Sequence, residues 1–370
     1  MIRLSKATIT DAEKSAVMTV LDREHLGMGE EVQQFEQELT EFFGRPAVCV
    51  VNGTAALHLA CQTVGLGSGD EVLVQSLTYL ASFQAISATG ATPVPCDIEP
   101  ATLTLNWRDA EKRLTPRTKA VMPVHYASGV GDIDGTYEFA GRHGLRVIED
   151  AAHAFGTRHG GIPVGGFGDI ACFSFDGIKN ITAGEGGCVV TEDQDVCRQA
   201  REARLLGVEP GAERLSSGER SWTFDVSNQG WRYHMSNIMA AIGLAQLERF
   251  STLAATRQAL ARHYDSLLAD RPRIHPIQRK CDGIVPHIYV VRVAGLMDRD
   301  SLRDDLLKRG IETGVHYMPN HRLSRYHVSS GRPLPATEAV YPELITLPLH
   351  PDLNDTDIQH VCDTLCGLVQ

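Results

Sequence analysis

The sequence lacks long hydrophobic runs and an excess of basic charge. No stretch of about 18 consecutive apolar residues occurs, so we expect no membrane-spanning helix. The opening residues, MIRLSKATITDAEKSAVMTV, carry charges every few positions and do not contain the apolar segment of a signal peptide. The formal net charge of −11 disfavours non-specific binding to nucleic acids, because an acidic surface repels the phosphate backbone. An anionic small ligand in a local pocket remains compatible with this charge.

The nine cysteines have no recognisable spacing. Neither a C-x-x-C pair nor the cysteine and histidine spacing of a zinc site is present, so we predict no metal site. An odd, scattered set is typical of reduced thiols, and we expect a cytoplasmic protein. The chain has 370 residues, of which 43% are hydrophobic and 22% charged, close to the average of soluble globular proteins. This length indicates two domains, or one large domain with a smaller appendage.

Short apolar runs alternate with helix-length segments over the first half of the chain. The runs are residues 47–51, 71–74, 92–95, 120–124, 146–149, 170–175 and 188–190. Strands that are apolar on both faces and alternate with helices are typical of a mostly parallel sheet covered on both sides. We therefore predict a three-layer α/β/α large domain with a seven-stranded sheet over residues 1–250. An amphipathic helix over residues 30–43, ending at Gly44, belongs to its N-terminal helical segment.

The second half of the chain has a different pattern. Residues 235–247 predict a helix that is apolar on more than one side, which favours burial against another subunit or domain. Beyond it we expect a helix at 256–269, a strand at 288–293, a helix at 300–309, a strand at 311–317 and a last helix from Asn354. The prediction is a small α+β C-terminal domain over residues 251–370.

One lysine lies in an unusual position, within FSFDGIKNITAGEGG at residues 173–187. Most lysines in loops are solvated surface residues. Lys179, however, follows an apolar strand and lies among glycines that allow a ligand to approach the backbone closely. Ligands of parallel sheets bind beyond the carboxyl ends of the strands. A partly desolvated lysine there has a lowered pKa and can form a Schiff base.

Three other strand ends carry polar or aromatic residues. Asp150 ends the 146–149 strand, where an acid is commonly a cap but where it also offers a carboxylate to a cationic partner such as a pyridinium nitrogen. Gly53 and Thr54 lie in a turn between a strand and a helix, a weak signal alone, yet suited to hold a phosphate. Tyr79 offers a ring that stacks on a heteroaromatic group, although a core tyrosine is the commoner case. Together with Lys179, these residues predict a pyridoxal phosphate site.

Seven stretches of the chain resemble, in order and spacing, one family of enzymes. They are NGTAALHLA, GDEVLV, VIEDAAHAFG, FSFDGIKNITAGEGG, MSNIMAAIGLAQLE, GVHYMPNH and LPLHPDL. The chain resembles the DegT/DnrJ/EryC1/StrS family of pyridoxal phosphate-dependent sugar aminotransferases over nearly its whole length. The resemblance implies the aspartate aminotransferase type of fold (fold type I) and a homodimer with active sites at the subunit interface. It also implies amino transfer from an amino acid to a keto-sugar nucleotide.

The resemblance assigns roles to residues of this chain. Lys179 would bind the cofactor covalently, Asp150 would pair with its ring nitrogen and Tyr79 would stack on its ring. His153 would lie near the phenolic oxygen of the ring. The phosphate would be held by Gly53, Thr54, Ala55 and Ser174. The substrate would lie near two histidines, His316 and His321.

Two positions depart from the pattern of the family. Arg232 replaces an asparagine that reaches the neighbouring subunit's cofactor phosphate, and His234 replaces an arginine. Since a guanidinium binds phosphate through its fork, Arg232 is a candidate for the same role. Asp176 replaces a frequent histidine close to Lys179.

We therefore predict transfer of an amino group, with L-glutamate as the preferred donor, to a nucleotide-linked keto sugar. A 4-keto-6-deoxy sugar is the preferred acceptor and a 3-keto sugar the alternative, for bacterial surface polysaccharide or antibiotic sugar synthesis. Two alternatives stay open at this point. One is an aminotransferase acting on a cyclitol or another non-nucleotide ketone, and the other is a regulatory protein that binds pyridoxal phosphate without turnover.

Overall fold

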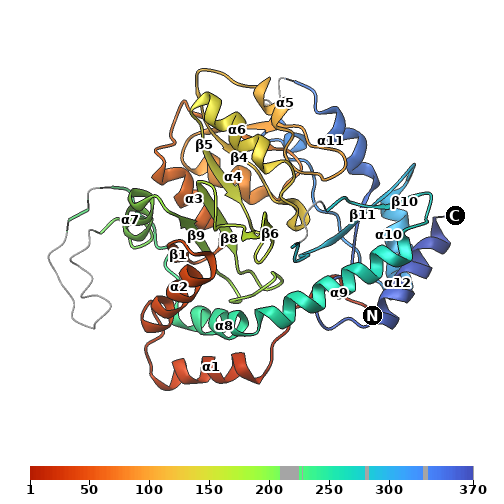
Figure 1. Cartoon of the computed structure of the whole chain (residues 1–370), viewed down its shortest axis with the longest axis horizontal. Coiled ribbons are helices and arrows are strands. Elements are labelled where there is room, and N and C mark those ends of the chain that lie inside the picture. The colour runs from red at the N-terminus through yellow and green to blue at the C-terminus, as the bar shows by residue number, and fades with distance from the viewer. Residues whose placement is uncertain (209–224, 227, 280–282, 328–331, 370) are drawn as a thin grey trace.

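The computed structural model describes residues 1–208, 225–226, 228–279, 283–327 and 332–369 (Figure 1). Its main feature is a seven-stranded sheet with the strand order β1-β9-β8-β5-β4-β2-β3. All pairings are parallel except those of β9 with its two neighbours. The strands are β1 (Ala47–Val50), β2 (Glu71–Gln75), β3 (Thr92–Cys96), β4 (Thr118–Met122), β5 (Arg146–Asp150), β8 (Ile170–Ser174) and β9 (Gly187–Thr191). Each of the seven predicted runs forms one of these strands.

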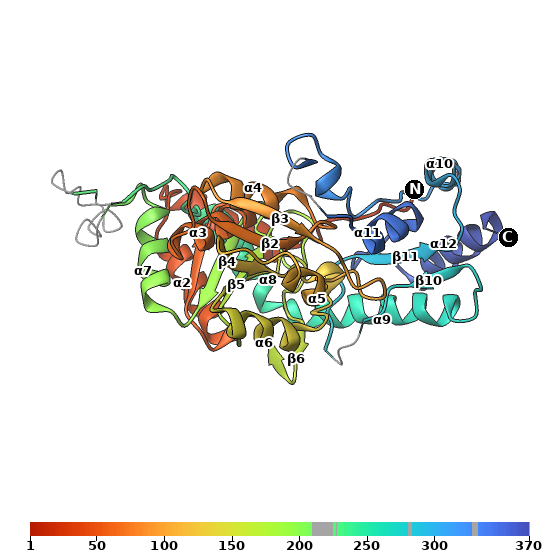
Figure 2. The same ribbon diagram turned by 90° about the horizontal axis from the view of Figure 1, so that it is seen from above.

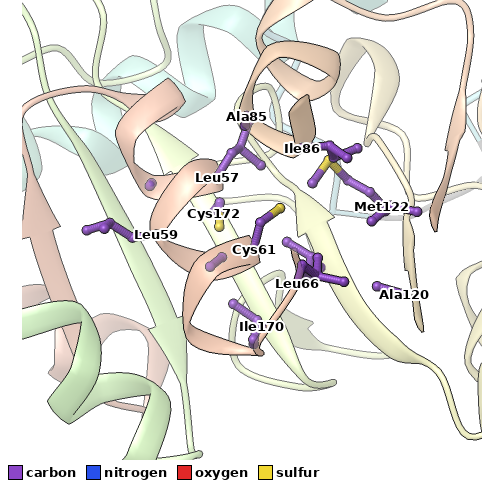
Figure 3. Close-up of a cluster of buried hydrophobic side chains, with 14 of the residues drawn as sticks. Leu57, Leu59, Cys61, Leu66, Ala85, Ile86, Ala120, Met122, Ile170 and Cys172 are labelled. Carbon is purple, nitrogen blue, oxygen red and sulfur yellow. The ribbon is translucent and has the colours of Figure 1, made fainter. Parts of the chain in front are cut away.

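Side chains of successive strand residues point to opposite faces, and each face is covered by its own helices. In β8, Ile170 and Cys172 face a core formed with α3 (Gly53–Thr63), α4 (Leu80–Ala88) and α7 (Gln194–Ala203). Figure 3 shows part of this core, in which Leu57 and Cys61 of α3 lie over the sheet. Phe173 faces the opposite core, with α2 (Glu30–Phe43) and α8 (Asn237–Glu248). The α/β/α layering and the mostly parallel sheet are as predicted from the sequence.

The remaining helices of this part of the chain cover its edges. The helices α5 (Trp107–Glu111) and α6 (Ile133–His143) pack beside β4 and β5. The helix α1 (Asp11–Asp22) packs on α8, and a short hairpin, β6 (Arg158–His159) with β7 (Ile162–Pro163), extends from the sheet. The predicted helix over residues 30–43 has these bounds in the structure and ends at Gly44, whose φ of 71° is the left-handed conformation that glycine adopts most easily.

A second sheet lies beyond residue 250. It is antiparallel, with the order β10 (Ile274–Pro276), β11 (Tyr289–Val293) and β12 (Leu344–Leu347). Its core is completed by α9 (Phe250–Leu268), α10 (Arg299–Lys308) and α12 (Asp355–Leu368), and α11 (Pro335–Val340) precedes β12. The two views show α9 running from α8 to this sheet (Figures 1 and 2). The boundary predicted after residue 250 falls at the first residue of α9, and the division into two domains stays a prediction.

The strand predicted over residues 311–317 is wrong. Only isolated bridges occur there, from Ile311 to Ile2 and from Gly314 to Thr346. The edge of β12 is therefore contacted at one point rather than along a strand. Ile311 belongs to the core of the C-terminal part. Val315 and Tyr317 pack against another core, in which Leu77 and Tyr126 lie with Ile288 and Val290.

The first residues of the chain pack on the C-terminal part. Ile2 contacts its core, the backbone N–H of Leu4 donates to Glu312, and Lys6 pairs with Asp352. Both ends of the chain lie beside α12 in Figure 2. None of the helices in the described part of the chain has the length and apolar character needed to cross a bilayer.

Candidate active site

Lys179 lies in the loop that joins β8 to β9, just beyond the carboxyl end of β8. Its backbone N–H donates to the carbonyl of Asp176 at 3.0 Å, and its side chain is half-buried. The Nζ atom lies 3.4 Å from Nε2 of His287. Burial lowers the pKa of Lys179 to about 8, against the opposing effect of the negative charges of Asp150 and Asp176. The amine is therefore much easier to deprotonate near neutral pH than an ordinary lysine.

Asp150 is the last residue of β5, the strand beside β8, and its side chain is buried. Its Oδ2 accepts a hydrogen bond from the hydroxyl of Ser82 at 2.6 Å, and its Oδ1 accepts one from the N–H of Ala152 at 3.2 Å. Two donors fix the plane of the carboxylate. Since it also acts electrostatically on Lys179, the structure brings together the two residues that the sequence predicts to be catalytic.

Three histidines and a tyrosine surround the lysine. The rings of His153 and His287 have centroids 4.6 Å apart, and Nε2 of His153 lies 2.9 Å from the hydroxyl of Tyr317. Burial, followed by the charge of Lys179, lowers the pKa values of His153 and His287 well below the usual range. The same two causes lower the pKa of His316 to about 4. All three imidazoles are therefore neutral at physiological pH and available as hydrogen-bond acceptors or donors.

Tyr79 immediately precedes α4, and 59% of its surface is exposed. Its ring lies 5.4 Å from that of Tyr317, at the same edge of the sheet as Lys179 and Asp150. An exposed aromatic ring beside buried polar groups is suited to stack on a planar ligand.

The N-terminus of α3 faces Ser174. Asn52 caps this helix by accepting from the N–H of Ala55 at 2.8 Å. A Cβ atom at Gly53 would lie 2.8 Å from Cβ of Ser174, so only glycine allows the helix to begin this close to the end of β8. Thr54 is exposed in the first turn. The four residues predicted to bind phosphate thus lie together, with backbone N–H groups at a helix N-terminus.

The loop before α8 is anchored by its backbone. Tyr233 donates its N–H to the carbonyl of Arg204 at 2.9 Å and accepts from the N–H of Val51 at 2.7 Å. The preceding Trp231 donates its N–H to the carbonyl of Ala203 at 2.6 Å. Arg232 lies between these two anchored residues, and its side chain is exposed and forms no ion pair with another described residue. Burial, followed by the charge of Arg232, lowers the pKa of His234. Tyr233, the residue after Arg232, thus contacts Val51, which lies two residues before the start of α3. The predicted role of Arg232 stays a prediction.

His321 is held by two partners. Its Nδ1 lies 2.7 Å from the hydroxyl of Ser76, at the end of β2, and its Nε2 lies 2.7 Å from Glu338. His316 differs, because only its Nδ1 has a partner in the described part of the chain, the hydroxyl of Thr346 at 2.8 Å. Both substrate-binding predictions remain predictions, and His321 has less freedom to contact a substrate than His316.

Comparison with known proteins identifies the family. The sequence pattern of the DegT/DnrJ/EryC1/StrS aminotransferase family matches residues 7–366. The chain belongs to this family. Spr1654 from Streptococcus pneumoniae, solved in apo, PLP and PMP forms, is 30% identical, with 100% of this chain and 97% of that chain covered and a TM-score of 0.93. The sugar aminotransferase CalS13 from Micromonospora echinospora is 30% identical, with coverages of 99% and 100% and a TM-score of 0.91.

A third similar structure is Helicobacter pylori PseC, an aminotransferase involved in the biosynthesis of pseudoaminic acid. It is 27% identical, with coverages of 99% of this chain and 98% of that chain and a TM-score of 0.92. These matches confirm the predicted family, fold and pyridoxal phosphate-dependent sugar aminotransferase activity. The alternative of a regulatory protein without turnover is therefore wrong.

The residues of this chain fit the cofactor. Nδ1 of His153 is buried without a hydrogen-bond partner among the described residues, beside the lysine. The carboxylate of Asp150 accepts hydrogen bonds from two neutral donors, and its oxygens have further lone pairs that can accept a ring N–H. Gly53 and Ser174 form a cradle at the N-terminus of α3. A dianionic phosphate, a ring nitrogen and an aldehyde each have a chemically matched group at this edge of the sheet.

Sequence reasoning missed three residues of the site. Tyr317 lies next to His316 in the motif GVHYMPNH, so its position in that motif could have identified it as a residue of the site. Ser82 follows Tyr79 by one helical turn, which places both at the start of α4. His287 gives no local signal, because it lies 108 positions from Lys179, in the segment that leads into β11.

Proposed function

We propose that the enzyme transfers an amino group from L-glutamate to a keto carbon of a nucleotide-linked sugar. A 4-keto-6-deoxy sugar is the preferred acceptor, and a 3-keto sugar is the alternative. The observation that carries this proposal is the pair formed by Lys179, with a pKa lowered to about 8, and the buried, doubly hydrogen-bonded Asp150. Amino transfer requires a base that exchanges one proton repeatedly and an anion opposite the ring nitrogen of the cofactor.

We assign each step to residues of this chain. Lys179 would hold the cofactor through its Nζ atom between turnovers, and the freed amine, with its lowered pKa, would accept and release the proton that moves during amino transfer. Asp150 would accept a hydrogen bond from the protonated ring nitrogen of the cofactor. When bound, pyridoxal phosphate supplies a ring that withdraws electrons from the carbon that loses its proton. Tyr79 would cover one face of the ring, and His153 would contact its phenolic oxygen.

The phosphate is assigned to the cradle at the start of α3. The N–H groups of Gly53, Thr54 and Ala55, with the hydroxyl of Ser174, bind it, supported by the partial positive charge of the helix N-terminus. We further propose a homodimer in which Arg232 of one subunit reaches the phosphate group of its partner's site or the diphosphate of the sugar nucleotide. Its exposed side chain supports this role.

The acceptor class is supported by the relatives. CalS13 is a sugar aminotransferase, and PseC acts in the biosynthesis of pseudoaminic acid. A role in bacterial surface polysaccharide or antibiotic sugar synthesis agrees with both. We place the enzyme in the cytoplasm, which is supported by the unpaired state of the cysteines in the described ranges.

The test is a panel of acceptors. The purified enzyme with pyridoxal phosphate and L-glutamate is mixed with 4-keto and 3-keto sugar nucleotides and, in parallel, with keto cyclitols. Mass spectrometry then detects replacement of the carbonyl oxygen by an amine. We expect conversion of a 4-keto-6-deoxy sugar nucleotide. Conversion of cyclitols alone would overturn the acceptor class while leaving the aminotransferase activity in place.

A further inference from the structure

A buried histidine from the C-terminal part of the chain contacts the reactive amine. His287 lies two residues before the start of β11, and only 3% of its surface is exposed. Its Nε2 lies 3.4 Å from Nζ of Lys179, within hydrogen-bonding distance of that amine. A group in contact with the amine that exchanges the proton is placed to influence where that proton resides.

The position of His287 is fixed by its backbone. Its N–H donates to the hydroxyl of Ser128 at 3.0 Å, and that hydroxyl donates in turn to the carbonyl of His153. Nη1 of Arg257, in α9, donates to the carbonyl of His287 at 3.2 Å. The backbone of His287 is therefore held by residues from both parts of the chain.

The charges around His287 determine its protonation state. Four groups that are cationic when protonated face it: Lys179, His153, His316 and Arg257. The carboxylates of Asp150 and Asp176 act on Lys179. A second positive charge in this buried cluster is unfavourable, and burial together with these neighbours lowers the pKa of His287 well below its usual range. The ring therefore stays neutral next to the lysine.

A neutral imidazole has one donor and one acceptor nitrogen. Nδ1 of His287 is buried and has no partner within the described ranges. With its proton on Nδ1, the ring presents the lone pair of Nε2 to Lys179. A protonated Lys179 can then donate an N–H to this lone pair.

We propose that His287 is the hydrogen-bond acceptor that receives the freed Lys179 in its protonated form and holds it beside the site. The inference rests on the proposed role of Lys179. His287 itself forms and breaks no covalent bond: its Nε2 accepts one N–H from the ammonium while Lys179 carries the proton taken from the donor, and Lys179 becomes the neutral amine again when that proton is released. His287 thereby determines how much of the freed lysine is protonated between the two proton transfers.

The test measures the pKa of Lys179 in cofactor-free enzyme. The protein is labelled with an amine-selective reagent at a series of pH values, and mass spectrometry quantifies modification of the peptide that contains Lys179. The exposed Lys119 of β4 serves as an internal reference in the same digest. Loss of an acceptor makes the ammonium less favourable, so His287→Phe should lower the pKa of Lys179 by about one unit. His287→Gln retains an acceptor oxygen and should restore most of that shift.

Each other outcome overturns the proposal. An unchanged pKa in His287→Phe would show that the ring only fills space. A raised pKa would show that His287 is itself charged, and equal shifts in the Phe and Gln variants would show an effect of packing rather than of hydrogen bonding. If His287→Phe does not fold, as judged by circular dichroism, the pKa of Lys179 is compared between wild type, His287→Gln and His287→Asn. A pKa that is the same in all three proteins would then overturn the proposal. Because the cofactor is absent, failure of this inference leaves the covalent role of Lys179 to be tested separately.

Discussion

Ser82, in the first turn of α4, donates a hydrogen bond of 2.6 Å to the carboxylate of Asp150 at the end of β5. The hydroxyl of Thr78 lies 3.1 Å from that of Ser82, so a chain of two hydroxyls leads from the end of β2 to the carboxylate. The residues that begin α4 thus orient the acid proposed to face the cofactor, and Tyr79 in the same segment is proposed to stack on the ring. One helix start serves two contacts with the same ligand.

This arrangement predicts a graded loss of activity. Asp150→Asn removes the charge opposite the ring nitrogen and should lower kcat by several orders of magnitude. Ser82→Ala removes only one donor to that carboxylate and should lower kcat by roughly tenfold, as for a hydrogen bond to a charged group. Ser82→Thr, which keeps the hydroxyl, is the matched control. Steady-state kinetics measures all three, and near-normal turnover of Asp150→Asn would show that another acid faces the ring.

Lys179 should be the residue that binds the cofactor covalently. Borohydride treatment of the loaded enzyme should fix the adduct on the peptide that contains Lys179, as detected by mass spectrometry. Lys179→Ala should lose turnover and keep its circular dichroism spectrum, because a single half-buried loop lysine contributes little to the fold. Lys119→Ala is a control that should change neither. An adduct on any other lysine would reject the assignment.

The lowered pKa of Lys179 predicts the pH dependence of cofactor binding. The amine reacts with an aldehyde only when neutral, so the rate at which cofactor-free enzyme is reconstituted should rise with pH and level off above a pKa of about 8. At pH 7 roughly a tenth of the amine would be neutral. Stopped-flow absorbance measures this rate. A rate that still rises steeply well above that pKa would show an ordinary, solvated lysine.

The cradle at α3 predicts an effect of adding one methyl group. Gly53→Ala would place a Cβ 2.8 Å from Cβ of Ser174, so the helix start or β8 has to shift. We expect the affinity for pyridoxal phosphate to fall by at least about tenfold, which corresponds to roughly 1.4 kcal/mol. Gly141→Ala, in α6, is the control, because a Cβ atom added there would have no neighbouring atom within 4 Å. This variant should leave the affinity for pyridoxal phosphate unchanged. Adding Ser174→Gly to Gly53→Ala should relieve the contact but also remove the hydroxyl, so a partial recovery is expected.

The variant Arg232→Ala distinguishes between two proposed roles of this arginine. If it binds the cofactor phosphate, Arg232→Ala should lose pyridoxal phosphate on dialysis. If it binds the diphosphate of the substrate, KM for the sugar nucleotide should rise with the cofactor retained. Either contact is expected to contribute roughly 1.5 to 3 kcal/mol, whereas a surface ion pair contributes at most about 1 kcal/mol. A variant without either effect would remove Arg232 from the site.

The same variant tests donation across the subunit interface. Mixing Arg232→Ala subunits with Lys179→Ala subunits should form hybrid dimers, in which one site receives an intact lysine from one chain and an intact arginine from the other. Recovery of activity on mixing supports the shared site. No recovery, although hybrids are detected by native mass spectrometry, would place Arg232 in its own subunit's site.

The local pattern of the sequence was sufficient for the large sheet and for much of the site. Each of its strands is a short apolar run, and Asp150 and Lys179 follow strands that lie side by side in parallel, so strand order along the chain already placed them at one edge. The pairing of strands in the C-terminal sheet could not be predicted from local patterns in the same way. The stretch 311–317 has the composition of a strand but forms only isolated bridges at Ile311 and Gly314, because β12 supplies the strand beside β11.

His287 illustrates what the sequence does not contain. Its contact with Lys179 depends on how the C-terminal sheet docks on the large one, which is determined by the shared core around Leu77 and Ile288 rather than by any motif. The hydroxyl of Ser82 was missed for a related reason. A serine in the first turn of a helix is common, and only the placement of β5 beside β4, which in turn pairs with β2, brings Asp150 within its reach.

The contacts of the first residues have a consequence for synthesis of the chain. Ile2 pairs with Ile311, and Lys6 pairs with Asp352. A ribosome makes the N-terminal residues first, yet their partners emerge only when most of the chain has been translated. The segment before α1 must therefore wait, undocked, while the large sheet assembles, and it closes onto the C-terminal part as one of the last events of folding.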